Sequence, residues 1–314
     1  MSSTQDSRPA TGPAGSTGAA ESAKSAGTPE NAGPQQPPAV RSFVALGDSF
    51  TEGMSDRLPD GSYRGWADLL AARLAAQPVP HAEGTGEPDP GSTDRPDPGG
   101  GFRYANLAVR GKLIAQIAAD QVDAAAAMNA DLVTLVGGLN DTLRPRCDMG
   151  RVLGVLEECV EKLAPSCGRL VLMRSPGRNG PVLERYRGRM ERLFGFIDEL
   201  AERHGALVVD LYAAPSLADP RMWADDRLHL TDEGHQRVAE AVWQGLGHPA
   251  ASDWRAPLAP SPLPSWPARR RADLRFVRQH LAPWVGRRLT GRSSGDGRTP
   301  KRPELTPLAC ENSP

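Results

Sequence analysis

Hydrophobic residues between positions 41 and 248 fall into two recurring patterns, short continuous runs and longer stretches with helical spacing. Continuous runs of Leu, Val and Ile are typical of strands in a sheet that is buried on both faces. Such runs predict five strands, over residues 42–47, 104–109, 132–136, 170–174 and 207–211. Apolar residues three or four positions apart predict helices over residues 63–76, 112–128, 149–163, 182–204 and 231–246.

The regular alternation of these strands and helices indicates the class of fold. Strand–helix–strand units join parallel strands by right-handed crossovers, which place helices on both faces of the sheet. We therefore predict an α/β domain over residues 41–248, with three layers, α/β/α, and a five-stranded parallel sheet. In sheets of this kind, binding sites form beyond the carboxyl ends of the strands.

The regions outside this domain differ from it in composition. Residues 1–40 are dominated by Ser, Thr, Ala, Gly, Pro and Gln without an apolar cluster, and residues 291–314 are similar. Such segments bury too little apolar surface to offset their loss of chain entropy, so we predict that both are disordered. We interpret residues 249–290 as a Pro-rich linker followed by a basic helical segment.

Charge and cysteine content narrow the range of functions. The formal net charge of −1 excludes a general attraction to nucleic acid. The four cysteines lack the spacing of a zinc site or a disulfide scaffold, so we expect reduced thiols and no metal or other cofactor. The chain begins without the basic and apolar regions of a secretory leader, which predicts a cytoplasmic protein.

A serine follows the first predicted strand, in the motif Gly47-Asp48-Ser49. A serine hydroxyl is a weak nucleophile at neutral pH and needs a partner base. A turn between two glycines, Gly47 and Gly53, would expose the hydroxyl. The motif also fits an ordinary turn, so it indicates a nucleophile only together with other residues.

Two further motifs follow the second and third predicted strands. Gly111 lies five residues after Asn106, and a glycine lets the backbone approach a ligand closely enough for its N–H to donate to an oxyanion. Asn140 lies in the motif Gly138-Leu139-Asn140-Asp141, and its side-chain amide can donate in the same way. Each motif alone also fits a turn or a helix cap.

A fourth motif pairs Asp226 with His229, three residues later. A histidine that acts as a base needs a carboxylate on one ring nitrogen to fix its tautomer, while the other nitrogen takes the serine proton. A spacing of three residues on a tight turn allows that contact to form locally. An exposed loop histidine is the alternative interpretation.

In this order, the four motifs resemble those of the SGNH hydrolases, the superfamily that includes the GDSL lipases and esterases. Residues 43–53, F-V-A-L-G-D-S-F-T-E-G, are similar to the nucleophile block, with Phe50 where many members carry Leu. The resemblance spans about residues 42–247 and implies the flavodoxin-like fold of that superfamily.

The resemblance also implies a role for each matched residue. Ser49 would be the nucleophile and His229 its base, oriented by Asp226; the three-residue spacing selects Asp226 over the adjacent Asp225. The backbone N–H groups of Ser49 and Gly111 and the side chain of Asn140 would form the oxyanion hole.

The expected function is therefore hydrolysis of a small-molecule carboxylic ester through an acyl-enzyme. Two alternatives stay open: a carbohydrate or thioester deacylase with the same triad, and a non-catalytic, membrane-recruited binding protein. Neither the acyl-chain preference nor the oligomeric state follows from the sequence.

Two segments outside the motifs each leave two interpretations open. Residues 77–101 are either a lid or a variable surface loop, and their Pro, Gly and acidic content favours the loop. Residues 266–292 contain eight arginines and one acidic residue, so they either contact an acidic surface or membrane or form a helix that docks on the domain. Here the docked helix is favoured.

Overall fold

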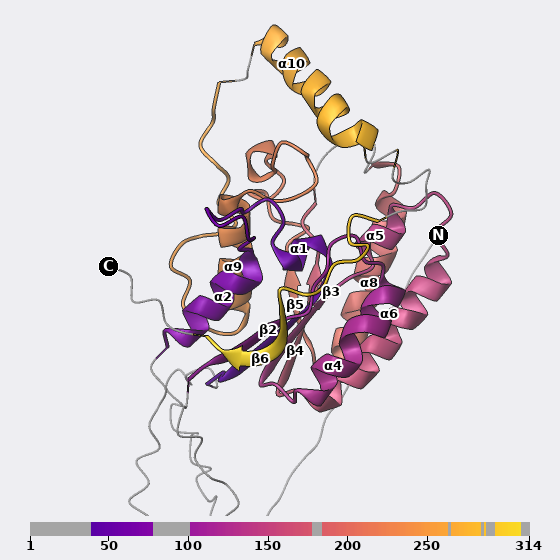
Figure 1. Cartoon of the computed structure of the whole chain (residues 1–314), viewed down its shortest axis with the longest axis vertical. Coiled ribbons are helices and arrows are strands. Elements are labelled where there is room, and N and C mark those ends of the chain that lie inside the picture. The colour runs from indigo at the N-terminus through magenta and orange to yellow at the C-terminus, as the bar shows by residue number, and fades with distance from the viewer. Residues whose placement is uncertain are drawn as a thin grey trace, which may run out of the picture. The chain divides into compact units, whose positions relative to one another are not determined.

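The computed structural model describes residues 39–77, 101–177, 184–262, 265–283, 286 and 293–308. Its sheet has six strands in the order β5-β4-β3-β1-β2-β6 (Figure 1). The first five strands pair in parallel, which confirms the α/β fold, and β6 is antiparallel to β2. The strands are β1 Ser42–Gly47, β2 Arg103–Asn106, β3 Leu132–Val136, β4 Arg169–Arg174, β5 Leu207–Asp210 and β6 Arg302–Pro307.

Helices cover both faces of the sheet, as the alternating pattern predicted. The α-helices are α1 Ser49–Glu52, α2 Trp66–Ala75, α3 Ile114–Ile117, α4 Asp123–Ala127, α5 Leu139–Thr142, α6 Met149–Leu163, α8 Arg187–His204, α9 Asp232–Gly245 and α10 Trp266–Phe276. The π-helices are η1 Ala118–Val122 and η4 Val277–Leu281, and the 3₁₀ helices are η2 Ala164–Ser166 and η3 Pro220–Met222. The helix predicted over 112–128 is thus divided into α3, η1 and α4.

The central strand β1 shows how the sequence produces two hydrophobic cores. Successive side chains of a strand point to opposite faces of the sheet. Phe43 and Ala45 enter one cluster with α2 and α9, whereas Val44 and Leu46 enter the other with α3, α6 and α8. Every residue of β1 is buried, so apolar side chains are favoured on both faces of the strand. This explains why its sequence is a continuous apolar run and does not alternate with polar residues.

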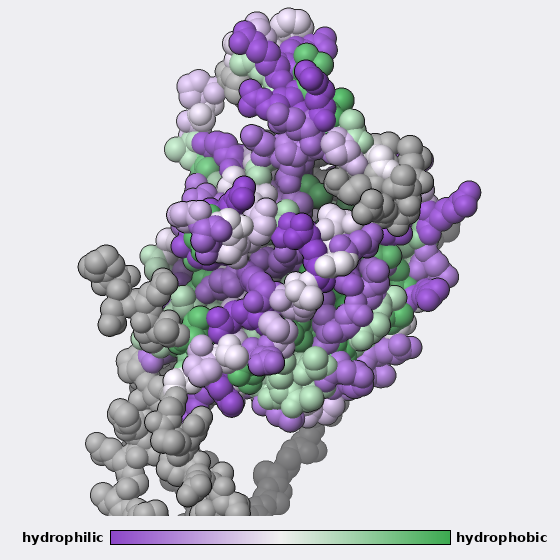
Figure 2. Space-filling view, in the orientation of Figure 1, coloured by the Kyte–Doolittle hydropathy of each residue, from purple (hydrophilic) through white to green (hydrophobic). Residues whose placement is uncertain are grey.

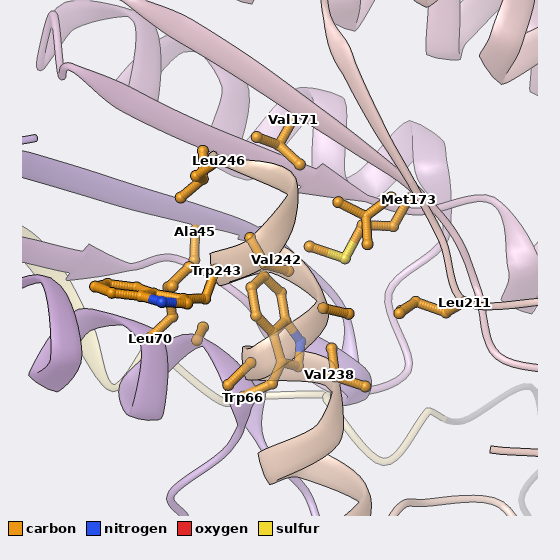
Figure 3. Close-up of a cluster of buried hydrophobic side chains, with 14 of the residues drawn as sticks. Ala45, Trp66, Leu70, Val171, Met173, Leu211, Val238, Val242, Trp243 and Leu246 are labelled. Atoms are coloured by element: carbon orange, nitrogen blue, oxygen red, sulfur yellow. The ribbon is translucent and has the colours of Figure 1, made fainter. Parts of the chain in front are cut away.

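Figure 3 shows the first of these clusters, between the sheet and helices α2 and α9. The indole of Trp66 in α2 lies beside Val242 of α9, and Leu70 is fully buried next to them. This packing ties the chain segment after the first strand to the last helix of the domain. It thereby brings together two regions that are more than 160 residues apart along the chain, as the bond from Trp66 N–H to His235 confirms.

The sixth strand corrects the prediction that residues 291–314 are disordered. Within the described part of that tail, Arg302–Pro307 pairs with β2 and extends the sheet by one strand. Lys301 just before it donates to the Glu52 and Tyr63 carbonyls, at 2.6 and 3.1 Å, and to the Asp68 carboxylate at 2.5 Å. The composition of the segment could not predict this strand, because the hydrogen-bond partners of its backbone lie on the free edge of β2.

Helix α10, which was expected to dock on the domain, contacts Arg227 of the domain but has no buried residue of its own. Trp266 and Leu274 are 63% and 64% exposed. The contacts with the domain involve Asp273, which forms an ion pair with Arg227, and Phe276, which lies against the Arg227 guanidinium. Figure 2 shows mostly hydrophilic side chains on the visible surface, with hydrophobic ones scattered among them. The contact of residues 266–292 with a membrane stays a prediction.

Other sequence-based expectations fall partly or wholly outside the described residues. Most of the segment 77–101, and residues 1–38 of the predicted disordered segment 1–40, belong to this group. Cys147, Cys159 and Cys167 are free thiols, whereas Cys310 lies outside. Among the helices that are described, none combines the length and hydrophobicity that crossing a membrane requires.

The packing of α2 predicts a contrast between two leucine-to-alanine substitutions. Leu70→Ala removes a fully buried side chain from the core and should lower the free energy of unfolding by about 2–5 kcal/mol. Leu274→Ala makes the same chemical change at an exposed position and should change it by less than about 0.5 kcal/mol. Urea denaturation of both variants tests this; equal losses would contradict the assigned core.

Candidate active site

Three of the four predicted motifs line one cavity at the carboxyl ends of the central strands. Strand order reverses between β1 and β3, the position at which open α/β sheets form their binding crevices. A cavity of about 610 Å³, including the space open to solvent, lies there. Ser49, Asn140 and His229 all line it, although they are far apart in the sequence. Its other lining residues are Asp48, Phe50, Met54, Val136, Gly137, Leu139, Leu143, Ser175, Pro176, Trp223, Leu228, Leu230 and His235.

A sharp turn between β1 and the short helix α1 presents Ser49. Gly47 passes so close to the next strand that a Cβ there would lie 2.7 Å from the Val136 carbonyl oxygen, so only glycine fits. The buried amide of Gln121 holds the Gly47 peptide groups by two hydrogen bonds, of 2.8 and 2.9 Å. Asp48 then caps α1 by accepting from the Phe50 N–H at 3.1 Å. Ser49 is therefore the first residue of α1 on a rigid support.

Asp48 connects this turn to the third strand. Its second carboxylate oxygen accepts a hydrogen bond from the Asn140 amide at 2.8 Å. Burial raises the pKa of Asp48 to about 6, although the Phe50 N–H and the charge of His229 act in the opposite direction. A carboxylate kept in so dry an environment must be held by hydrogen bonds, and Asn140 supplies one of them.

The same asparagine also reaches the loop that follows the second strand. Its amide nitrogen lies 3.1 Å from the Lys112 carbonyl oxygen, to which it donates. The neighbouring Asp141 accepts from the Ile114 N–H at 3.0 Å and so holds the start of α3. Asn140 and Asp141 thus connect the ends of β1, β2 and β3, which explains why the two residues stand side by side.

The Asp226–His229 turn forms a local unit between η3 and α9. Trp223 and Leu230 form an isolated antiparallel bridge that closes the loop. One Asp226 oxygen accepts from the N–H groups of Leu228 and His229, both at 3.0 Å. The other oxygen lies 2.5 Å from the His229 Nδ1 atom. A single carboxylate therefore shapes the turn and orients the imidazole.

The electrostatics of Asp226 follow from these contacts. Burial acts to raise the pKa of its carboxyl, but the hydrogen bond and the charge of His229, with the two backbone N–H groups, lower it to about 2. Asp226 is therefore ionised at neutral pH and accepts the Nδ1–H of the ring. The Nε2 atom is left to take up a proton from another group.

Two predicted features of the site are the contact between Ser49 and His229 and the position of Gly111. In the described part of the chain, no hydrogen bond joins the Ser49 hydroxyl to the His229 ring, although both line the same cavity. Gly111 has a positive φ of 74°, as a tight turn requires, but is not a lining residue of the cavity. Its carbonyl accepts a hydrogen bond from the Ser293 hydroxyl in the C-terminal segment.

Several residues near the site were not singled out by the sequence. His235 is a buried lining residue of the cavity, where its Nδ1 accepts from the Trp66 N–H at 3.3 Å and its Nε2 contacts the Met54 carbonyl at 3.2 Å. Burial lowers the pKa of His235 to about 4, so the ring is neutral and structural. Its position in α9, four residues after Thr231, gave no signal of this contact.

Glu52, three residues after Ser49, is a second such residue. Its carboxylate accepts from the Arg110 N–H at 2.6 Å and from the Arg110 guanidinium, so the helix that carries Ser49 also holds the loop that carries Gly111. Trp223 lines the cavity and also packs against the hydrophobic core. Within the described ranges, no three His, Cys, Asp or Glu side chains come together as a potential metal site.

Comparison with known proteins identifies a family for this chain. The model of the GDSL-like Lipase/Acylhydrolase family matches residues 45–237, which contain all four motifs. None of the curated proteins compared matches the chain.

The chain is similar to several solved structures at low sequence identity. A mutant of Axe2, an acetyl-xylooligosaccharide esterase from a Geobacillus species, is 20% identical, with a TM-score of 0.51 over 68% of this chain and 97% of its own. A catalytic mutant of the acetylxylan esterase Axe2 from Geobacillus stearothermophilus is 19% identical, with a TM-score of 0.52 over the same shares. LAE5, an alpha/beta hydrolase enzyme from the metagenome of Lake Arreo, Spain, is 24% identical, with a TM-score of 0.49 over 66% and 95%. With a family model that covers more than half of its length, this chain belongs to the GDSL-like lipase/acylhydrolase family and is a hydrolase of ester bonds.

Proposed function

We propose that the chain hydrolyses carboxylic esters with Ser49 as the nucleophile, His229 as the general base and Asp226 as the carboxylate that orients it. The observation that carries this proposal is the 2.5 Å contact between Asp226 and His229 Nδ1, in a turn at the cavity that Ser49 also lines. It leaves Nε2 as the ring atom for the serine proton. A rotation of the Ser49 or His229 side chain on binding of the substrate would complete the contact, as is common for catalytic hydrogen bonds.

The proposed reaction has two steps. In the first, His229 takes the Ser49 proton while the serine oxygen bonds to the ester carbonyl carbon. The tetrahedral intermediate collapses, the bond to the alcohol breaks, and His229 returns the proton to the leaving alkoxide. In the second step, His229 takes a proton from water, the hydroxide attacks the acyl-enzyme, and the acid leaves as Ser49 regains its proton.

The oxyanion would be stabilised by three donors, the N–H groups of Ser49 and Gly111 and the Asn140 amide. Donors of this kind are effective when they are held in place before the charge develops. Asn140 satisfies that condition because Asp48 and Lys112 hold its amide. The oxyanion would share the N–H that now donates to the Lys112 carbonyl, which is the longer of the two bonds.

The cavity favours an acyl group of modest size. Many of its lining residues are apolar, among them Phe50, Leu139, Leu143, Trp223 and Leu228. An apolar pocket with a few polar groups at one side is typical of sites for small ligands. Acetylated sugars are a second candidate class of substrate, since the fold resembles that of an acetylxylan esterase, and they belong in the same substrate series.

Substitution of the nucleophile tests the proposal. Ser49→Ala should lower kcat for p-nitrophenyl acetate by about 10⁴- to 10⁶-fold and abolish labelling by a fluorophosphonate probe, because it removes the oxygen on which the acyl-enzyme would form. Ser252→Ala, at an exposed serine away from the cavity, is the matched control and should behave as the wild type. A folded wild-type protein that neither labels nor hydrolyses any ester in the series would refute the proposal.

Substitution of the oxyanion donor should affect turnover more than binding. We expect Asn140→Ala to lower kcat by about 10²- to 10³-fold with a small change in KM, because the amide stabilises charge that develops only in the transition state. Asn140→Asp, which keeps the shape but loses the N–H donors, should be impaired as strongly. Full activity of the aspartate variant would exclude the amide from the oxyanion hole.

The contact between Asp226 and His229 should also stabilise the fold in a pH-dependent way. Because its pKa falls from 3.8 to about 2 on folding, the carboxylate contributes about 2 kcal/mol above pH 3.8, and the contribution disappears as the pH falls through about 2. Asp226→Asn should therefore be less stable than the wild type at pH 5, and the difference should narrow toward pH 2.

Urea denaturation at pH 5, 4 and 3 measures this dependence. Asp225→Asn changes the exposed neighbouring residue and serves as the control, with no difference expected at any of the three pH values. A constant loss of stability in Asp226→Asn across this range would show that the carboxylate acts through packing and not through its charge.

A further inference from the structure

The C-terminal segment returns to the candidate active site after α10 and η4. Strand β6 pairs with β2 (Figure 1). Lys301, just before β6, donates to the carbonyl of Glu52 at the end of α1. Residues 293–296 form a turn in which the Ser293 N–H donates to the Asp296 carboxylate at 2.8 Å. This turn lies on the loop that carries Gly111.

The contact between the two loops is tight on both sides. The Ser293 hydroxyl donates to the Gly111 carbonyl at 3.3 Å, and a Cβ on Gly111 would lie 2.4 Å from that hydroxyl oxygen. A Cβ on Gly295 would lie 2.0 Å from the Arg110 carbonyl oxygen. Each loop therefore presents a glycine where the other approaches, and a side chain at either position would displace its neighbour.

These contacts determine the direction of one peptide group. The Arg110 carbonyl and the Gly111 N–H belong to the same planar trans peptide and point in opposite directions. Because the carbonyl faces Gly295, the N–H faces away from the C-terminal turn. On the other flank, Glu52 binds the N–H and guanidinium of Arg110 and so holds the residue from which this peptide begins.

We propose that the turn 293–296 positions the Gly111 N–H as an oxyanion donor, through Gly295 against the Arg110 carbonyl and Ser293 on the Gly111 carbonyl. The inference rests on the proposed function, because it assigns a task to a donor of that mechanism. Gly295 and Ser293 are positioning residues, since their contacts are with the loop. The C-terminal segment is then part of the catalytic domain and not an appendage.

Two substitutions in the full-length chain test the proposal. Gly295→Ala adds a methyl group against the Arg110 carbonyl, and Ser293→Ala removes the hydroxyl on Gly111 without adding atoms. Loss of one oxyanion donor lowers turnover by about 10²- to 10³-fold, so partial displacement in Gly295→Ala should lower kcat for p-nitrophenyl acetate by about 10- to 100-fold. The loss in Ser293→Ala should be smaller, about 3- to 10-fold. KM should change by less than about threefold in both, because the affected interaction forms in the transition state.

The matched control is Gly297→Asn, in the same segment. A Cβ there meets no atom within 4 Å, and asparagine tolerates the positive φ of 71°. This variant should keep the kcat and KM of the wild type. Thermal unfolding of each variant shows whether it is folded at the assay temperature, and Ser293→Ala decides the matter if Gly295→Ala does not fold.

The outcomes separate the two proposals. If Ser293→Ala and a folded Gly295→Ala keep kcat within twofold of the wild type while Ser49→Ala is inactive, the positioning role is wrong and the triad stands. The positioning role is also wrong if Gly297→Asn loses as much kcat as Gly295→Ala, since any disturbance of the segment would then suffice. If Ser49→Ala retains turnover, the proposed function itself fails.

Discussion

The two hydrogen bonds of the Asn140 amide hold together the three loops on which the chemistry of this fold depends. One bond reaches Asp48, next to the proposed nucleophile, and the other reaches Lys112, next to Gly111. Each loop follows a different strand. Packing of the helices alone would leave the positions of the loops relative to one another imprecise. A short, directional contact from one amide to both neighbours supplies the accuracy that an oxyanion hole needs.

This arrangement places an ionisable group in an unfavourable environment. Asp48 is buried, and the rise in its pKa shows that its negative charge is less favourable here than in water. Its position is useful because it caps α1 and orients Asn140 at the same time. Asp226 shows the opposite balance, because His229 and two backbone N–H groups more than offset its burial. The site thus combines one carboxyl group that burial disfavours with one that its partners stabilise.

Much of the fold could be predicted because local patterns and long-range packing agree. The apolar runs 42–47 and 132–136 form strands with the predicted bounds. Asp226 and His229 are only three residues apart, so the contact between their side chains could be predicted from the local sequence. The roles of Gln121 and His235 could not be predicted, because their partners lie 74 and 169 residues away along the chain.

The sixth strand escaped prediction for a related reason. Residues 302–307 carry no apolar run, and their order comes from the free edge of β2 and the anchoring of Lys301. The composition of a segment indicates how much apolar surface it can bury. This segment is held instead by backbone hydrogen bonds to β2 and by the ion pair of Lys301 with Asp68. Helix α10 before it contacts Arg227, yet Trp266 and Leu274 are exposed, so the helical spacing of apolar residues does not lead to burial here.

A crystal structure of the wild-type protein after reaction with a fluorophosphonate would test the central claim most directly. The adduct mimics the tetrahedral intermediate, so its phosphorus should be bonded to Ser49 Oγ. Its phosphonyl oxygen should lie within about 3 Å of the N–H groups of Ser49 and Gly111 and of the Asn140 amide. An adduct whose phosphonyl oxygen faces solvent, with His229 turned away from Ser49, would contradict the account.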